Sequence, residues 1–129
     1  MQTILVAYDD TEPAKRALVR ASELARVLGA RLVVTTVGPV DATIGPAAEL
    51  DLPELAQARA QLEDRGIDAE YQPALGEPAD AIVEVAAKRN ADLIVLGTRE
   101  PGVVERMLGH SVSHAVLRLA SCDVLVVRR

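Results

Sequence analysis

A glycine-containing stretch near the end of the chain has the residue types and the spacing of a phosphate-binding loop. Four consecutive apolar residues, 93–96, precede Gly97, and the segment then contains Gly102 and Gly109 before a helical pattern begins at Ser111. In open α/β sheets, ligands bind just outside the carboxyl ends of the strands. The N–H groups at the start of a helix carry partial positive charge, which suits phosphate. The sequence therefore directs the search for a binding site to this segment.

Polar side chains in the same segment could contact an anion. Arg99 is a cation in the loop, and Ser113 offers a hydroxyl in the first turn of the following helix. His110 and His114 stand four residues apart, which would suit a metal pair, but no third ligand has an obvious place, so a solvated helix start is the simpler interpretation. His110 could instead make a pH-dependent phosphate contact. Ser111 could also serve only as a helix N-cap.

Apolar runs alternate with helical patterns along the chain and predict the order βαβαβαβαβ. Continuous apolar runs are typical of strands covered on both faces, and strands separated by helices predict a parallel sheet with right-handed crossovers. The third strand alternates and contains Pro73, which is typical of a sheet edge. We expect one α/β domain over residues 1–129. The expected strands are 4–8, 32–37, 68–74, 93–96 and 124–127, and the expected helices are 12–28, 52–65, 79–89 and 111–119.

The composition limits the possible classes of function. The formal net charge of −5 argues against nucleic acid as a partner, because non-specific binding needs a basic surface. No apolar run approaches the roughly 18 residues of a membrane span, and the start of the chain lacks the basic region of a signal peptide. The single cysteine, Cys122, excludes an internal disulfide and favours a cytoplasmic location. Its simplest interpretation is a small buried or half-buried side chain.

Three blocks of the sequence, in order and over essentially the whole chain, resemble the universal stress protein family. They are ILVAYDDTEPAKRAL, GEPADAIVEVAAKRNADLIVLGTR and SVSHAVLRLASCDVLVVRR. The resemblance implies a three-layer, Rossmann-like α/β fold with an open five-stranded parallel sheet in the order 3-2-1-4-5 and helices on both faces. It also implies a homodimer, often formed by the last strand and its copy. The strand that contains Val124 and Val127 would be an exposed apolar edge, which such pairing would cover.

The resemblance also implies how an adenine nucleotide would be held. Family members that bind ATP resemble one another in the motif Gly-x2-Gly-x9-Gly-Ser/Thr after the fourth strand. Gly97 matches the first glycine and Ser111 the hydroxyl, but Glu100 and His110 stand at the other two glycine positions, with Gly109 one residue early. Glu100 would repel a polyphosphate at close range. The motif is therefore degenerate. The remaining glycines, cations and serines could form a phosphate site of altered shape.

The nucleoside end of the motif is better matched. Asp9, after the first strand, matches the acidic residue of the family that contacts the nucleoside, and Val37 matches a position whose backbone meets the adenine. Asp10 stands where the family usually has glycine and adds a second negative charge. An acid pair at a helix start is also favoured by the helix dipole alone. That interpretation stays open for Asp9 and is the preferred one for Asp10.

This sequence lacks residues that other protein classes with the same strand–helix pattern require for their chemistry. A phosphate-accepting receiver domain needs an Asp after the third strand, where residues 74–76 read Ala-Leu-Gly, and a Lys after the fifth, where the chain reads Arg-Arg. The sequence contains no Walker loop, no GxGxxG after the first strand and no nucleophile elbow. No general base is placed to activate a water, so turnover of bound ATP should be slow or absent.

The sequence therefore predicts a cytoplasmic, homodimeric binding or regulatory module and no enzyme. The candidate ligand is ATP or another adenine nucleotide, with Mg²⁺ only as its companion. The alternative is a protein-interaction module of the same fold that binds no nucleotide. The candidate binding residues are Asp9, Val37, Gly97, Arg99, Gly102, Gly109, His110, Ser111 and Ser113.

Overall fold

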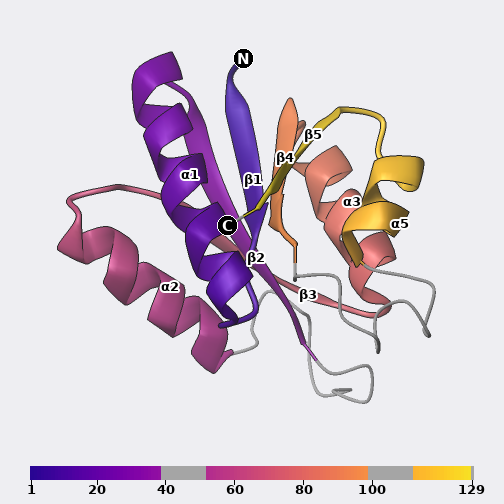
Figure 1. The fold of residues 1–129 in the computed structure, drawn as a ribbon, viewed down its shortest axis with the longest axis horizontal. Coiled ribbons are helices and arrows are strands. Elements are labelled where there is room, and N and C mark those ends of the chain that lie inside the picture. The colour runs from indigo at the N-terminus through magenta and orange to yellow at the C-terminus, as the bar shows by residue number, and fades with distance from the viewer. Residues whose placement is uncertain (39–51, 99–111, 129) are drawn as a thin grey trace.

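The chain folds into a five-stranded parallel sheet between two layers of helices (Figure 1). The computed structural model describes residues 1–38, 52–98 and 112–128. The sheet order is β3-β2-β1-β4-β5, and every neighbouring pair is parallel. Both the predicted order and the predicted edge position of the third strand are confirmed. The elements are β1 (Thr3–Ala7), α1 (Glu12–Leu28), β2 (Arg31–Gly38), α2 (Pro53–Asp64), β3 (Glu70–Leu75), α3 (Pro78–Lys88), β4 (Leu93–Gly97), α5 (Val112–Leu119) and β5 (Asp123–Val127).

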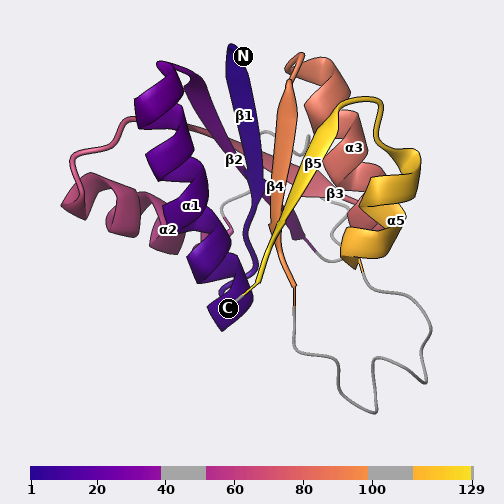
Figure 2. The ribbon, with the colours of Figure 1, turned by 45° about the horizontal axis from the view of Figure 1, so that its top comes forward.

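Helices cover both faces of the sheet, α1 and α2 on one side and α3 and α5 on the other (Figures 1 and 2). Alternate residues of β1 point into different layers. Ile4 and Val6 pack in the cluster that contains Leu18 of α1, whereas Leu5 packs in the cluster that contains Ile82 of α3. All five side chains are buried. The two covered faces explain why the central strands read as continuous apolar runs.

Local signals set both ends of α1. The hydroxyl of Thr11 accepts a hydrogen bond from the Ala14 N–H at 3.3 Å, and Pro13 occupies the first turn. At the other end Gly29 adopts φ 64°, the left-handed conformation in which glycine has no Cβ penalty. The start of α1 is therefore fixed immediately after Asp9 and Asp10, at the carboxyl end of β1.

Candidate functional site

The carboxyl edge of the sheet brings together residues from three adjacent strands. Asp9 follows β1, Val37 lies near the end of β2, and Gly97 ends β4. The strand order reverses at β1, because β2 lies on one side of it and β4 on the other. Figure 2 shows the three strands running together toward the end of the sheet where α1 begins. This is the crevice position at which open α/β sheets bind ligands.

The carboxylate of Asp9 is exposed and held by its own turn. Its Oδ1 accepts hydrogen bonds from the Thr11 hydroxyl at 2.6 Å and from the Thr11 N–H at 3.2 Å. The same hydroxyl accepts from Ala14, so Asp9 and Thr11 together cap α1. The helix-start role that the sequence left open for Asp9 is therefore present. A ligand role is compatible with this capping role, because both hydrogen bonds from Thr11 use the same carboxylate oxygen, Oδ1.

The backbone conformation of Asp10 is one that favours glycine, the residue that the family usually has at this position. Its φ of 64° lies in the left-handed region, which glycine adopts freely and which Asp tolerates better than most residues. The Lys15 Nζ lies 3.7 Å from Asp10 Oδ1 and 3.5 Å from Glu12 Oε1. These carboxylates, Glu12 foremost, raise the pKa of Lys15 above its usual value. Lys15 is a residue of this edge that the sequence analysis did not single out.

Tyr8, also missed as a candidate, ties the carboxyl end of β1 to α2. Its buried hydroxyl donates to Gln57 Oε1 at 2.5 Å and accepts from Gln61 Nε2 at 2.8 Å. Its carbonyl accepts from the Thr36 hydroxyl of β2 at 2.8 Å. Burial raises the pKa of the Tyr8 phenol, although the Gln61 hydrogen bond opposes the shift. A tyrosine at the end of an apolar run, in a chain without Trp or Phe, was the available signal.

Gly97 has a packing role that is independent of any ligand. A Cβ at this position would overlap the carbonyl group of Pro13 and come within 2.9 Å of the Ala14 nitrogen. Both obstructing groups are main chain, in the first turn of α1. The end of β4 therefore lies directly against the start of α1, and only glycine fits without a shift of one or the other.

Of the residues predicted to contact phosphate, those that follow the loop are partly described by the structure. Ser113 lies in the first turn of α5 and is half-buried, and the neighbouring His114 is exposed. Val37 packs against the apolar cluster between the sheet and α3.

Within residues 1–38, 52–98 and 112–128, no group of three or more His, Cys, Asp or Glu side chains could hold a metal ion. The predicted residues that lie outside the described ranges are Arg99, Gly102, Gly109, His110 and Ser111.

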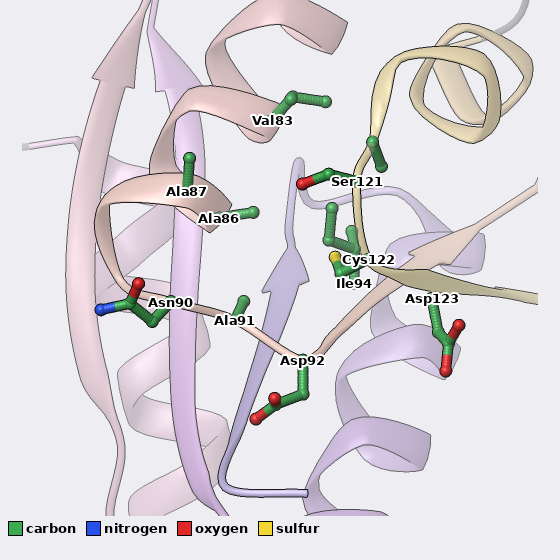
Figure 3. Close-up of a pocket in the computed structure, with 11 residues that line it drawn as sticks. Val83, Ala86, Ala87, Asn90, Ala91, Asp92, Ile94, Ser121, Cys122 and Asp123 are labelled. Atoms are coloured by element: carbon green, nitrogen blue, oxygen red, sulfur yellow. The ribbon is translucent and has the colours of Figure 1, made fainter.

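A pocket of about 560 Å³ opens at the opposite edge of the sheet, between α3 and the amino ends of β4 and β5 (Figure 3). Ser121 points toward α3, whereas Asp92 and Asp123 point away from it. Burial, followed by the charge of Asp123, raises the pKa of the half-buried Cys122 thiol above its usual value. The thiol is thus protonated at neutral pH and a poor nucleophile. This pocket shares no residue with the carboxyl edge.

Comparisons with known proteins agree with the fold. The model of the universal stress protein family matches residues 1–128. The Thermus aquaticus protein named "Universal stress protein in QAH/OAS sulfhydrylase 3′ region" is 39% identical over 135 residues, with 98% of each chain covered. Universal stress protein YxiE of Bacillus subtilis is 34% identical, with 97% of each chain covered. The crystal structure of a universal stress protein in complex with cAMP superposes with a TM-score of 0.81 at 31% identity, covering 98% of this chain and 96% of that one.

No helix among the described residues combines the length and the apolar character needed to cross a membrane.

Proposed function

The chain belongs to the universal stress protein family, and we propose that it is a dimeric regulatory module that binds an adenine nucleotide at the carboxyl edge of its sheet. One observation carries the proposal: Asp9, Val37 and Gly97 lie at the carboxyl ends of three neighbouring strands, where the strand order reverses. Ligands of open α/β sheets bind at that point. The relative crystallised with cAMP, which is 31% identical to this chain, supports an adenine ligand.

The residues have distinct roles in this proposal. Asp9 accepts a hydrogen bond from a ribose hydroxyl through Oδ2, because Oδ1 already accepts two from Thr11. The main chain at Val37 meets the adenine, and the N–H groups at the start of α5 face the phosphate, with Ser113 beside them. Magnesium enters only as the companion of a triphosphate. The nucleotide acts by being bound, and no catalytic step is assigned to the site.

The proposed dimer forms through β5. This strand ends the sheet order, and its residues 124–126 are half-buried although they are apolar. The neighbouring helix α5 also exposes Val112, Leu117 and Leu119, by 42%, 53% and 45%. An exposed strand edge is a template for pairing with another chain. Pairing of β5 with its copy would cover the edge and bring the apolar side chains of α5 close to the interface.

Native mass spectrometry tests binding and assembly together. Protein purified without added nucleotide is titrated with cAMP, AMP and ATP, and we expect a dimer that takes up one adenine nucleotide per subunit. Asp9→Asn should weaken the uptake, whereas Thr11→Ala removes the hydroxyl that contacts Asp9 but keeps the carboxylate and should weaken it less. Glu23→Gln, an exposed change in the second half of α1, is the charge-matched control. A dimer that takes up none of the three ligands would instead support the nucleotide-independent interaction module.

A separate pair of variants tests the dimer interface. Val126→Lys places a charge on the half-buried edge strand and should give a monomer. Val27→Lys makes the same change in α1, where the side chain is 81% exposed, and should leave the dimer intact. A dimer that survives Val126→Lys would exclude β5 as the interface.

A further inference from the structure

One buried hydrogen bond joins the two strands that carry the proposed nucleoside contacts. The Thr36 hydroxyl of β2 donates to the Tyr8 carbonyl oxygen at 2.8 Å, and Thr36 is only 2% exposed. Thr36 immediately precedes Val37, and the Tyr8 carbonyl belongs to the peptide group that leads into Asp9. The bond therefore connects the main chain beside the two residues to which the proposed function assigns the nucleoside.

This peptide group lies where the chain leaves the sheet. The Tyr8 N–H still donates to the Thr35 carbonyl of β2 at 2.9 Å, as in a parallel ladder. Asp10 then has a φ of 64°, and α1 begins soon after it, so the chain turns away from β2. The Thr36 hydroxyl thus orients the peptide group immediately before the turn, and this orientation sets the direction in which Asp9 leaves the strand.

The hydrogen bonds within the turn do not set the distance between Asp9 and β2. Thr11 donates to the Asp9 carboxylate through its hydroxyl and its N–H, and Thr11 is the N-cap of α1. These bonds orient the carboxylate relative to α1. The bond from Thr36 crosses from β2 to the end of β1, so it constrains Asp9 relative to Val37 instead.

We propose that Thr36 is a positioning residue of the nucleotide site. Its hydroxyl holds the peptide group before Asp9 so that the carboxylate reaches a ribose hydroxyl while the adenine lies against the main chain at Val37. The inference rests on the proposed function, and Thr36 itself touches no ligand. A hydrogen bond to a charged group strengthens binding by roughly tenfold or more, and it weakens steeply when its geometry is disturbed. Loss of the Thr36 hydroxyl should therefore weaken nucleotide binding about fivefold.

The neighbouring threonine supplies a matched control. Thr35 is also buried, and its hydroxyl donates to the Gln72 carbonyl of β3 at 2.6 Å. Successive side chains of a strand point to opposite faces of the sheet, and this second hydroxyl bonds to the strand on the other side of β2. Thr35→Val and Thr36→Val each remove one buried hydroxyl from the same strand, so they should lower the melting temperature by similar amounts. Only Thr36→Val should weaken binding.

Isothermal titration calorimetry tests the proposal with whichever of cAMP, AMP and ATP the wild-type protein binds most tightly. We expect Thr36→Val to bind this ligand about fivefold more weakly, whereas Thr36→Ser keeps the hydroxyl and should restore wild-type affinity. Thr36→Ala also removes the hydroxyl and should behave as Thr36→Val does, which keeps the test decisive if the valine variant does not fold. In an Asp9→Ala background, Thr36→Val should have no further effect, because the carboxylate that Thr36 positions is gone.

The outcomes separate this inference from the proposed function. If the wild-type protein binds none of the three ligands, both are wrong. If the wild-type protein binds one of them and the variants without the Thr36 hydroxyl bind it as tightly, the positioning role is wrong and the binding function stands. The positioning role is also wrong if Thr36→Ser binds as weakly as Thr36→Val, if Thr35→Val weakens binding as much, or if Thr36→Val causes the same loss in the Asp9→Ala background.

Discussion

Gly97→Ala should destabilise the protein because β4 ends against the first turn of α1. The added Cβ would overlap the Pro13 carbonyl group and approach the Ala14 nitrogen to 2.9 Å. Overpacking in a well-packed interior costs about 1–3 kcal/mol. We expect about 3 kcal/mol, the upper end of this range, because the obstructing atoms belong to the main chain and cannot rotate away as a side chain can.

A loss of this size is easily measured. Domains are stable by only about 5–15 kcal/mol, and about 3 kcal/mol should lower the melting temperature of a chain of this length by about 10 °C. The chain contains no Trp, so unfolding in urea is best followed by far-UV circular dichroism. The midpoint should fall while the slope stays the same, because the surface exposed on unfolding is unchanged.

Gly29→Ala is the matched control for this change. Gly29 has φ 64° and no atom within 4 Å of an added Cβ. Its replacement should therefore cost only the left-handed conformation, about 1 kcal/mol. The reasoning is refuted if the Gly97→Ala and Gly29→Ala variants lose the same free energy of unfolding, or if Gly29→Ala loses more. In that case β4 and α1 separate at little cost, and packing no longer accounts for the glycine.

Three further side chains give predictions for the same protein. Asp92→Asn should lower stability at pH 7, because the Asp92 carboxylate accepts hydrogen bonds from the Gln2 and Thr3 N–H groups, at 2.8 and 2.9 Å, and these bonds lower its pKa. A carboxyl group with a lowered pKa stabilises the fold above its unfolded pKa and loses that effect as the pH falls. The urea midpoints of variant and wild type should therefore converge toward pH 3, and a constant difference would contradict this assignment. Tyr8→Phe should cost about 1–2 kcal/mol in thermal denaturation, because two glutamines of α2 lose their partner. Tyr71→Phe, at a half-buried tyrosine of β3, is its control, and equal losses would refute the argument. The raised pKa of Cys122 should make its alkylation by iodoacetamide slower at pH 7 than that of a cysteine peptide, with a midpoint at higher pH. An equal or faster rate at pH 7 would contradict this expectation.

Much of the fold was predictable because its signals are local. The ends of α1 follow from Thr11 and Gly29, which act within a turn of their own positions. The central strands follow from apolar runs that must be covered on both faces. Each predicted strand and helix ends within two residues of the bounds that the described residues show. The strand order 3-2-1-4-5 came from the family resemblance, because periodicity alone does not order parallel strands.

The parts of the site that were missed depend on contacts between distant segments. The partners of Tyr8 are Gln57 and Gln61, about fifty residues away, and no local pattern connects them. The obstruction at Gly97 comes from Pro13, at the other end of the chain. Sequence periodicity identifies which residues are buried, but it does not identify which main-chain atoms approach a given Cα.

The family motif and the structure give different weights to Gly97 and Asp10. Gly97 matches the motif, yet the main chain of α1 would require glycine there even if no nucleotide were bound. Its presence is therefore weak evidence for a phosphate site. Asp10 departs from the usual glycine, yet its φ of 64° lies in the left-handed region that glycine adopts freely, and its side chain adds a charge that glycine lacks. Since Asp tolerates left-handed backbone better than most residues, the departure changes the charge of this turn more than it changes whether the turn forms. The number of motif glycines after β4 is thus a weaker guide to nucleotide binding in this chain than the motif alone suggests, because packing against α1 already accounts for Gly97.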